Sequence, residues 1–281
     1  MDTPQIIPER TAKTPGNKRK WKIFLLAIAA AALLFGGYLF ITLQVYPTVL
    51  PQQAVHLLKD ATLPQPGQKV LIFSPHPDDE TIAAGGYIAE ARQLGADVRI
   101  VLVTDGNKHH NEAVRYEEFK KATAILGVPE SNLVFLGLPD DKLRQKDQTV
   151  LSLRLKEQID LYNPDIIIYP CRQDFHPDHA VTGKIVSQLL AASNSKVIAF
   201  QYLVHYEFFF PHPRQFKPDL FLLPPARLVR FGNNWQKVMF PQSIENLKQQ
   251  AIYSYKSQLN NSLLKDLLLA GIRQNELLML Q

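Results

Sequence analysis

From residue 69 onward, the chain alternates short apolar runs with stretches that have the periodicity of amphipathic helices. The apolar runs are typical of buried strands, and Gly95 ends the first helical stretch. The expected strands are 69–74, 98–103, 133–136, 165–169 and 197–204, and the expected helices are 80–94, 112–126, 150–162 and 177–192. This alternation predicts an α/β fold: a Rossmann-like, doubly wound, mainly parallel sheet with helices on both faces and right-handed crossovers.

The C-terminal part of the chain has a less regular pattern. Residues 205–235 are rich in aromatic residues and proline, which favours irregular strands and loops. Residues 243–256 and 262–279 then show helical periodicity. Two further helices are therefore expected after the main sheet.

An uncharged stretch of 23 residues, 23–45, precedes this domain. It is long enough to cross a hydrocarbon core of about 30 Å, and it exceeds the apolar region of about 7–15 residues in a cleavable signal peptide. Four Lys/Arg lie within residues 18–22, whereas none occurs between Ile23 and Leu58. The positive-inside bias predicts a single-pass transmembrane helix with a cytoplasmic N-terminus and an extracytoplasmic domain. The expected organisation is a cytoplasmic basic tail at 1–22, a transmembrane anchor at 23–45, a linker at 46–68 and a domain at 69–281.

The formal charge of +5 is concentrated at the N-terminus. Residues 1–22 hold six Lys/Arg against Asp2 and Glu9, which gives +4, so the rest of the chain is about +1. A nearly neutral domain argues against nucleic-acid binding, because that function needs a basic face to neutralise phosphates. The single cysteine, Cys171, excludes an intramolecular disulfide and a zinc site built from several cysteines. Because it directly follows an expected strand, we interpret it as a buried structural residue.

Two clusters of titratable residues follow expected strands that are far apart in the sequence. His76-Pro77-Asp78-Asp79 follows the strand 69–74, and His176-Pro177-Asp178-His179 follows the strand 165–169. The carboxyl ends of parallel strands meet at one edge of a sheet, so we expect the clusters to converge there. A divalent metal can hold several imidazoles and carboxylates together, and two His with one carboxylate and an open position form a catalytic zinc set.

The residue types in these clusters suggest which side chains bind a metal and which face a bound water or a substrate. The turn at 76–79 leaves a strand and enters a helix, so one Asp can bind a metal while its neighbour points at a bound water. Glu80 lies at the helix start, where a carboxylate interacts favourably with the helix dipole, and direct catalysis is its alternative role. In the second cluster one His can complete the metal set while the other faces a substrate, and Asp178 can bind the second ring nitrogen of His176. Three histidines outside both clusters are interpreted as core or surface residues: His56, His205 and His212.

Both clusters resemble the motifs of the LmbE-like or PIG-L family of zinc-dependent deacetylases, which includes N-acetylglucosaminyl-phosphatidylinositol deacetylase. The resemblance extends over about residues 69–280 through short matches at Thr104-Asp105-Gly106, Arg115, Glu118, residues 135–140, Lys248, Ala251, Tyr253, Ser257 and Gln258. One position departs from the family pattern, since Asn107 stands where many members carry Glu.

The resemblance implies a role for each motif residue. It implies that His76, Asp79 and His179 bind Zn²⁺ and that Asp78 is the general base. It also implies that a cationic His176 stabilises the oxyanion, that Asp178 orients this ring and that Arg115 contacts the substrate. For Arg115 an exposed salt bridge on a helix is the alternative. The implied reaction removes the acetyl group from an N-acetylglucosamine-type sugar or glycoconjugate.

Two other functions fit parts of the same pattern. Two His and one carboxylate also form the triad of non-haem Fe(II) oxygenases, although those ligands usually lie on a jelly-roll sheet. A membrane-anchored carbohydrate-binding module without catalysis is the second alternative, although a binding module does not need an acidic neighbour beside a metal ligand. The sequence leaves the exact substrate and the oligomeric state open.

Overall fold

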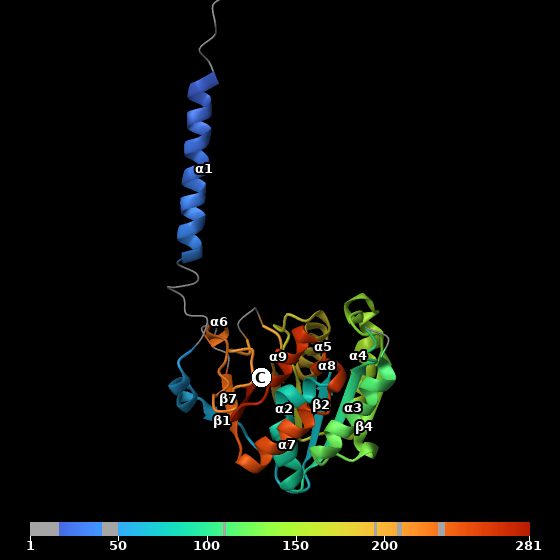
Figure 1. Ribbon diagram of the computed structural model, residues 1–281. Helices are drawn as coiled ribbons and strands as arrows, with labels where there is room; N and C mark the ends of the chain where they lie inside the picture. The colour runs from blue at the N-terminus through green and yellow to red at the C-terminus, as the bar shows by residue number, and fades with distance from the viewer. Residues whose placement is uncertain (1–16, 41–49, 109–110, 194–195, 207–209, 230–233) are drawn as a thin grey trace, which may run out of the picture. The chain divides into compact units, whose positions relative to one another are not determined.

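The computed structural model describes residues 17–40, 50–108, 111–193, 196–206, 210–229 and 234–281. The chain divides into two compact units, Met1–Pro47 and Thr48–Gln281. Figure 1 shows the helix α1 in the first unit and an α/β domain in the second.

The helix α1 (Asn17–Phe40) is the described part of the first unit. Its stretch Lys20–Phe40 has a mean hydropathy of 2.4, and none of that stretch is buried. A helix of this length and composition can cross a membrane, but a signal sequence near an N-terminus has the same properties. Residues 41–45 of the predicted span lie outside the described residues.

The second unit is built on an eight-stranded sheet with the order β1-β7-β8-β6-β5-β2-β3-β4. Its strands are β1 (Lys59–Asp60), β2 (Lys69–Ser74), β3 (Asp97–Thr104), β4 (Leu133–Leu138), β5 (Ile166–Pro170), β6 (Ile198–Tyr202), β7 (Asn234–Met239) and β8 (Asn275–Leu280). The strands β6, β5, β2, β3 and β4 pair in parallel, which confirms an α/β fold with a mainly parallel sheet. From β2 the chain continues to β3 and β4 on one side and then returns to β5 and β6 on the other.

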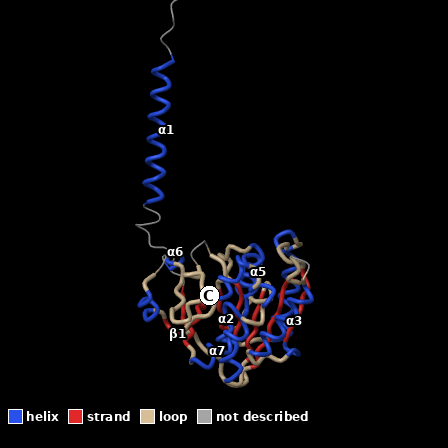
Figure 2. Tube along the Cα trace, viewed as in Figure 1, coloured by secondary structure: helices blue, strands red, loops and turns tan. Residues whose placement is uncertain are grey.

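Alternate residues of the central strands face two separate cores. Val70 and Ile72 pack with helices α2, α3 and α7, whereas Leu71 and Phe73 pack with α4 and α5. Helices therefore cover both faces of the sheet, as the sequence predicts (Figure 2). The helices of the domain are α2 (Asp79–Gln93), α3 (Glu112–Ile125), α4 (Gln148–Tyr162), α5 (Pro177–Ala192), α6 (Ala226–Val229), α7 (Gln242–Ile252), α8 (Lys256–Leu259) and α9 (Ser262–Ala270), with 3₁₀ turns η2 (Gln52–Leu57), η3 (Glu130–Asn132) and η4 (Leu143–Gln145).

The prediction of one helix over residues 262–279 is wrong in its second half. The helix α9 ends at Ala270, and β8 begins at Asn275 and pairs antiparallel with both β6 and β7. Leu277 and Leu278 of this strand face different cores, so burial on both sides of the sheet determines the conformation. The run of leucines has a high helix propensity, and tertiary packing overrides it here.

Part of the segment assigned to the linker, residues 46–68, packs on the domain. In η2 the side chain of Val55 is buried, with 1% of its surface exposed, and the strand β1 pairs in parallel with β7. Lys237 of β7 also donates from Nζ to the carbonyl of Leu58, at 2.6 Å. The described residues from 50 to 60 thus contribute to one end of the sheet.

The helix α2, which begins at Asp79, is broken at Ala84, where φ is −140° and ψ is 15°. A buried ion pair binds the backbone groups at this kink: Lys248 Nζ donates to the carbonyl of Ile82 at 2.9 Å, and Glu276 accepts from the amides of Gly86 and Tyr87 at 2.6 and 2.9 Å. Lys248 Nζ and Glu276 Oε1 are themselves 2.6 Å apart. In an unbroken helix the amide of residue 86 would bond the carbonyl of residue 82, so the ion pair replaces backbone bonds that the kink removes.

We expect Lys248→Met to lower the free energy of unfolding of the full chain by about 3–5 kcal/mol, because it leaves the buried carboxylate of Glu276 without its counter-charge. Denaturant titration followed by tryptophan fluorescence measures this loss. The exposed Lys121 on α3 provides the matched control, since Lys121→Met should change the same quantity by less than about 0.5 kcal/mol. Equal stabilities of the two variants would contradict this account of the kink.

Candidate active site

The two sequence clusters meet where β2 and β5 lie side by side. β2 ends at Ser74 and β5 ends at Pro170. The two strands are paired in parallel, so the segments that follow them leave the sheet at the same edge. This pair is also the point from which the chain continues in opposite directions along the sheet, and open α/β folds place their binding crevices at such points. The prediction that the clusters converge is confirmed.

The turn that carries the first cluster has an unusual backbone. Asp78 has a φ of 130°, a conformation that L-residues rarely adopt, and such strain is found mostly at functional sites. Arg115 of α3 stabilises this turn, because its guanidinium donates to the carbonyl of Pro77 at 2.7 Å and to Asp78 Oδ2 at 3.2 Å. Thr104 of β3 donates from Oγ1 to the carbonyl of Pro75, at 2.7 Å.

Glu80 stabilises the turn from inside the protein. It lies in the first turn of α2, as expected, but it is fully buried. Its carboxylate accepts hydrogen bonds from the hydroxyls of Ser74, Thr81 and Tyr255, at 2.9, 2.6 and 2.5 Å. Glu80 therefore connects the end of β2 to the C-terminal part of the domain in addition to its place at the helix dipole.

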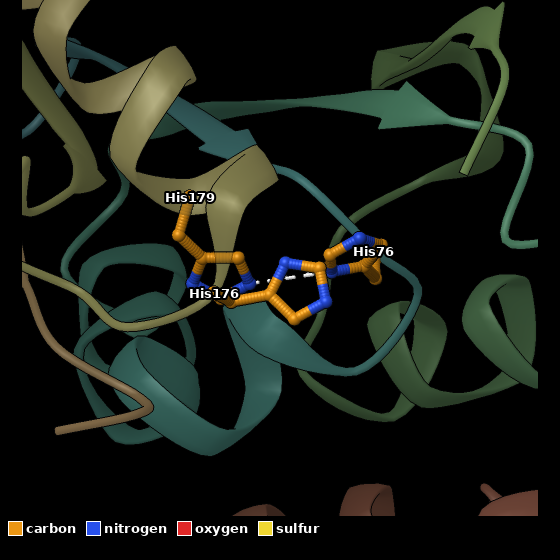
Figure 3. Close-up of side chains that lie close together, drawn as sticks. All are labelled: His76, His176 and His179. Atoms are coloured by element: carbon orange, nitrogen blue, oxygen red, sulfur yellow. Dashed lines mark hydrogen bonds between the residues drawn. The ribbon is translucent and has the colours of Figure 1, made fainter. Parts of the chain in front are cut away.

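Three donor atoms converge at the centre of the site. His76 Nδ1 lies 3.1 Å from Asp79 Oδ2 and 3.2 Å from His179 Nε2, and the last two atoms are 2.9 Å apart. Figure 3 shows the rings of His76 and His179 together with that of His176. A tetrahedral zinc ion with bonds of about 2.0–2.1 Å has ligand atoms about 3.3 Å apart, so this triangle has the size of one face of such a site.

Buried carboxylates contact the outer nitrogens of both imidazoles. His76 Nε2 lies 3.2 Å from Asp140 Oδ1 and 3.3 Å from Asp178 Oδ2, and His179 Nδ1 lies 3.2 Å from Asp174 Oδ2. Metal-binding histidines commonly have a carboxylate on the ring nitrogen that faces away from the metal, because it fixes the tautomer and the ring orientation. The arrangement leaves His76 Nδ1 and His179 Nε2 to face the centre of the triangle.

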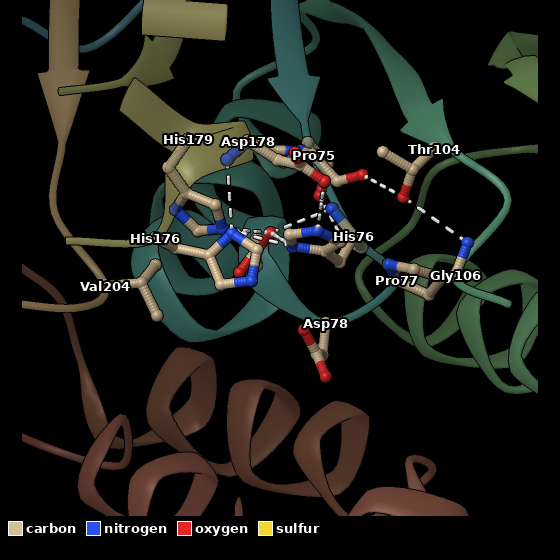
Figure 4. A network of polar contacts seen from close by, with 12 residues as sticks. Pro75, His76, Pro77, Asp78, Thr104, Gly106, His176, Asp178, His179 and Val204 are labelled. Atoms are coloured by element: carbon tan, nitrogen blue, oxygen red, sulfur yellow. Dashed lines mark hydrogen bonds and ion pairs between the residues drawn. The ribbon is translucent and has the colours of Figure 1, made fainter. Parts of the chain in front are cut away.

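The prediction that Asp178 binds the ring of His176 is wrong. The carboxylate of Asp178 accepts from the backbone amides of Asp141 and Leu143, at 2.7 and 3.0 Å, and its contact with an imidazole is to His76. The backbone amide of Asp178 is what reaches His176, donating to Nδ1 at 3.3 Å, so the ring caps the N-terminus of α5 (Figure 4). The side chain of residue 178 points back toward the first cluster, and sequence spacing does not show this.

The position of His176 favours a neutral ring. Burial, together with the charges of His76, His179 and His205, lowers its pKa to about 4. Because Nδ1 accepts a backbone amide, the proton of the neutral ring is on Nε2. The hydrogen bond at Nδ1 thus favours a neutral donor over the cationic His176 that the resemblance implies.

The two adjacent aspartates have opposite protonation behaviour. For Asp79, burial raises the pKa, but the charges of His179 and His76 outweigh it and hold the pKa well below its usual range. For Asp78, burial raises the pKa to about 8, and the charge of Arg115 opposes only part of this effect. One carboxylate thus stays ionised between two imidazoles while its neighbour can exchange a proton near neutral pH.

Sequence analysis missed two residues of the site, Asp174 and His205. Asp174 accepts from the backbone amides of His176, Val204 and His205 at 2.9, 2.9 and 3.0 Å, and so joins the turns after β5 and β6. His205 lies with Nδ1 3.3 Å from Asp174 Oδ1 and lines the cavity, which corrects its interpretation as a core or surface residue. The sequence does contain a signal for this residue. His205 directly follows the expected strand 197–204, and this places it at the same edge of the sheet as the two clusters.

A cavity of about 280 Å³ opens over these residues. Its polar side is formed mainly by the two clusters and the residues around them, and its apolar side by Ile82, Leu264, Leu267 and Leu268. Arg115 lines this cavity with only 7% of its surface exposed, so the alternative of an exposed salt bridge is wrong. Cys171 is buried and unpaired, as expected.

Residues 71–190 match the family model described as GlcNAc-PI de-N-acetylase, or PIG-L. This stretch of the chain therefore matches the PIG-L domain. It includes both histidine clusters and Arg115, and therefore every residue to which the resemblance assigns a role.

Several known proteins that are similar to this stretch are named as deacetylases. A protein of Bacillus anthracis named "Probable N-acetyl-alpha-D-glucosaminyl L-malate deacetylase 2" is 32% identical over 136 residues, which are 43% of this chain and 59% of that protein. The diacetylchitobiose deacetylase of Thermococcus kodakarensis is 32% identical over 131 residues, 41% of this chain and 46% of that protein. The chain thus spans about half the length of these relatives.

A solved structure shows the same fold. The zinc-inhibited form of teicoplanin deacetylase Orf2 has a TM-score of 0.55 and 18% sequence identity to this chain, and the similarity covers 75% of this chain and 97% of that one. The fold of the α/β domain is therefore one already known from a deacetylase.

Proposed function

We propose that this chain is a zinc-dependent hydrolase that removes the acetyl group from an N-acetylglucosamine-type sugar or glycoconjugate. The observation that carries the proposal is the convergence of His76, Asp79 and His179 beside Asp78 at one cavity. The PIG-L domain and the names of its relatives, which are deacetylases of N-acetylated sugars, support the same reaction.

The donor atoms fit zinc in number, type and spacing. His76 Nδ1, Asp79 Oδ2 and His179 Nε2 would hold the ion, and three protein ligands leave a fourth position for water or substrate. When bound, zinc supplies Lewis acidity to the acetyl carbonyl and makes a water molecule acidic enough to attack near neutral pH. A zinc-inhibited structural neighbour is consistent with a site that responds to this metal.

Asp78 accepts the proton of the attacking water in this proposal. Its carboxylate lines the cavity next to the ligand Asp79, and Arg115 holds Oδ2 at 3.2 Å. Addition of water oxygen to the acetyl carbon is followed by cleavage of the carbon–nitrogen bond, and the proton held by Asp78 passes to the leaving nitrogen. The products are acetate and a free amino sugar, so atoms and protons balance.

His176 donates a hydrogen bond to the oxygen on which negative charge develops. Its Nε2 carries the proton of the neutral ring, and the ring lies with its centroid 4.5 Å from that of His76, at the same cavity. A donor that is already held in place costs little reorganisation during the reaction. Arg115 is a positioning residue, since its contacts orient Asp78 and the strained turn.

The alternative of an Fe(II) oxygenase loses its support. The ligands of such a triad usually lie on a jelly-roll sheet, whereas here they follow the carboxyl ends of parallel strands. A binding module without catalysis would need neither the protonatable carboxylate of Asp78 nor its contact with Arg115.

We further propose that α1 anchors the protein in a membrane with the N-terminus in the cytoplasm and the catalytic domain outside. The stretch Lys20–Phe40 and the basic residues that precede it support this orientation.

We expect the full chain, purified in detergent, to contain about one zinc ion per molecule by elemental mass spectrometry, because the three ligands make one tetrahedral site. The double variant His76→Ala/His179→Ala should lose this zinc. His56→Ala, which removes a histidine outside the site, should retain it. Stoichiometric zinc in the folded double variant would refute the proposed ligands.

We expect Asp78→Asn to retain zinc and to lower kcat for acetate release by about 100-fold or more, because the amide cannot accept the proton of water. The assay measures acetate released from N,N′-diacetylchitobiose. Asp160→Asn, at an exposed carboxylate paired with Lys156 on α4, serves as the control and should keep the full rate. A zinc-loaded Asp78→Asn protein with a normal rate would assign the base to another group.

We expect an alkaline phosphatase fused after residue 281 to be active in cells and a cytoplasmic fluorescent reporter at the same place to stay dark. The charge difference across the span gives this direction. The reverse pattern would place the catalytic domain in the cytoplasm, and the substrate would then have to be a cytoplasmic one.

A further inference from the structure

A second and larger hollow, of about 810 Å³, lies beside the active site along the helix α5. We call it the α5 groove. Its polar and charged wall residues come from four segments: Arg144 from η4, Gln148 from α4, Arg172 from the turn after β5, and Lys184, Ser187 and Gln188 from α5.

The α5 groove carries positive charge only. Arg144, Arg172 and Lys184 line it, and no carboxylate does so among the described residues. Within the part of the chain that the structure describes, none of these three cations forms an ion pair or a side-chain hydrogen bond. The domain outside the N-terminal tail has a net charge of only about +1, so three unpaired cations in one groove are a local concentration and not a general property of the surface.

The α5 groove adjoins the active site through two direct connections. Pro177 and Ala180 line the groove, and their chain neighbours His176 and His179 belong to the active site. On the other wall, Arg144 follows Leu143, whose amide donates to Asp178 Oδ1 at 3.0 Å. From Pro177 to Ala191 the helix rises by about 21 Å, which exceeds one sugar ring and suits a chain of several sugars.

We propose that the α5 groove binds the anionic part of the substrate, so that the enzyme deacetylates amino sugars within an acidic polysaccharide. This inference rests on the proposed function, and it specifies the substrate class. The unpaired cations would contact carboxylate or phosphate groups of the polymer while one N-acetylated residue occupies the catalytic cavity. A concave groove along one helix fits a single flexible chain, whereas a lipid surface is contacted by protruding cations.

The test measures binding of two end-labelled octasaccharides to the full chain in neutral detergent, by fluorescence anisotropy at low salt. A hyaluronan octasaccharide alternates N-acetylglucosamine with glucuronate, and a chito-octasaccharide of the same length is uncharged. One pair of opposite charges in contact in water changes the dissociation constant by about fivefold. We therefore expect the triple variant Arg144→Gln/Arg172→Gln/Lys184→Gln to raise the dissociation constant for hyaluronan by about 100-fold and to leave that for the neutral ligand unchanged. Lys121→Gln, at an exposed cation on α3, should bind both ligands as the wild type does. Rising salt should weaken binding of the charged ligand only.

Three results would overturn the proposal. The first is equal hyaluronan binding by the wild type and the triple variant, and the second is no preference of the wild type for the charged ligand. The third is a loss of binding in the triple variant that appears only with micelles containing phosphatidylglycerol. The last result would assign the groove to a lipid surface. Acetate release from the neutral octasaccharide is measured on the same samples. If charge-dependent binding persists without any acetate release, the proposed reaction fails and the groove stands; if acetate is released without a charge preference, the groove proposal alone fails.

Discussion

The structure of the site depends on the burial of carboxylates that must find hydrogen-bond donors. Asp174 accepts hydrogen bonds from the backbone amides that follow β6, and Asp178 accepts them from the amides of residues 141 and 143. Glu80 accepts hydrogen bonds from three hydroxyls. Each of these carboxylates joins the catalytic turns to a segment far away in the sequence. An unpaired buried carboxylate is very costly, so the loops around the cavity are held together by the same groups that orient the imidazoles.

Much of the fold could be predicted from the sequence, because the apolar runs of the central strands alternate with stretches of helical periodicity. The convergence of the two clusters also followed from a general rule of parallel sheets. His205 obeyed the same rule, but a lone histidine lacks the acidic neighbours that marked His76 and His179. The individual metal and catalytic roles remain predictions, which the proposed experiments address.

What the sequence could not show were contacts that depend on side-chain direction and long-range pairing. Asp178 and His176 are two residues apart, yet the carboxylate turns to the first cluster, since the amides of residues 141 and 143 lie on that side. Arg115 lies on a helix that looks solvent-exposed in its charge pattern, and its burial under the turn at residues 76–79 is a tertiary effect. The strand at 275–280 has the composition of a helix, and its position between two other strands decides its conformation.

That strand has a further consequence for how the protein is made. β8 comes last among the described strands, yet it lies inside the sheet, between β6 and β7. Within this described sheet it connects β7 and β1 to the strands β6, β5, β2, β3 and β4. It also carries Glu276, which completes the kink in the helix that begins at Asp79. During synthesis residues 275–280 leave the ribosome about 200 residues after β2, so the part of the sheet that depends on β8 cannot form before then. A nascent chain that ends before residue 275 would have the proposed metal ligands but not the support that Glu276 gives to the helix that begins at Asp79.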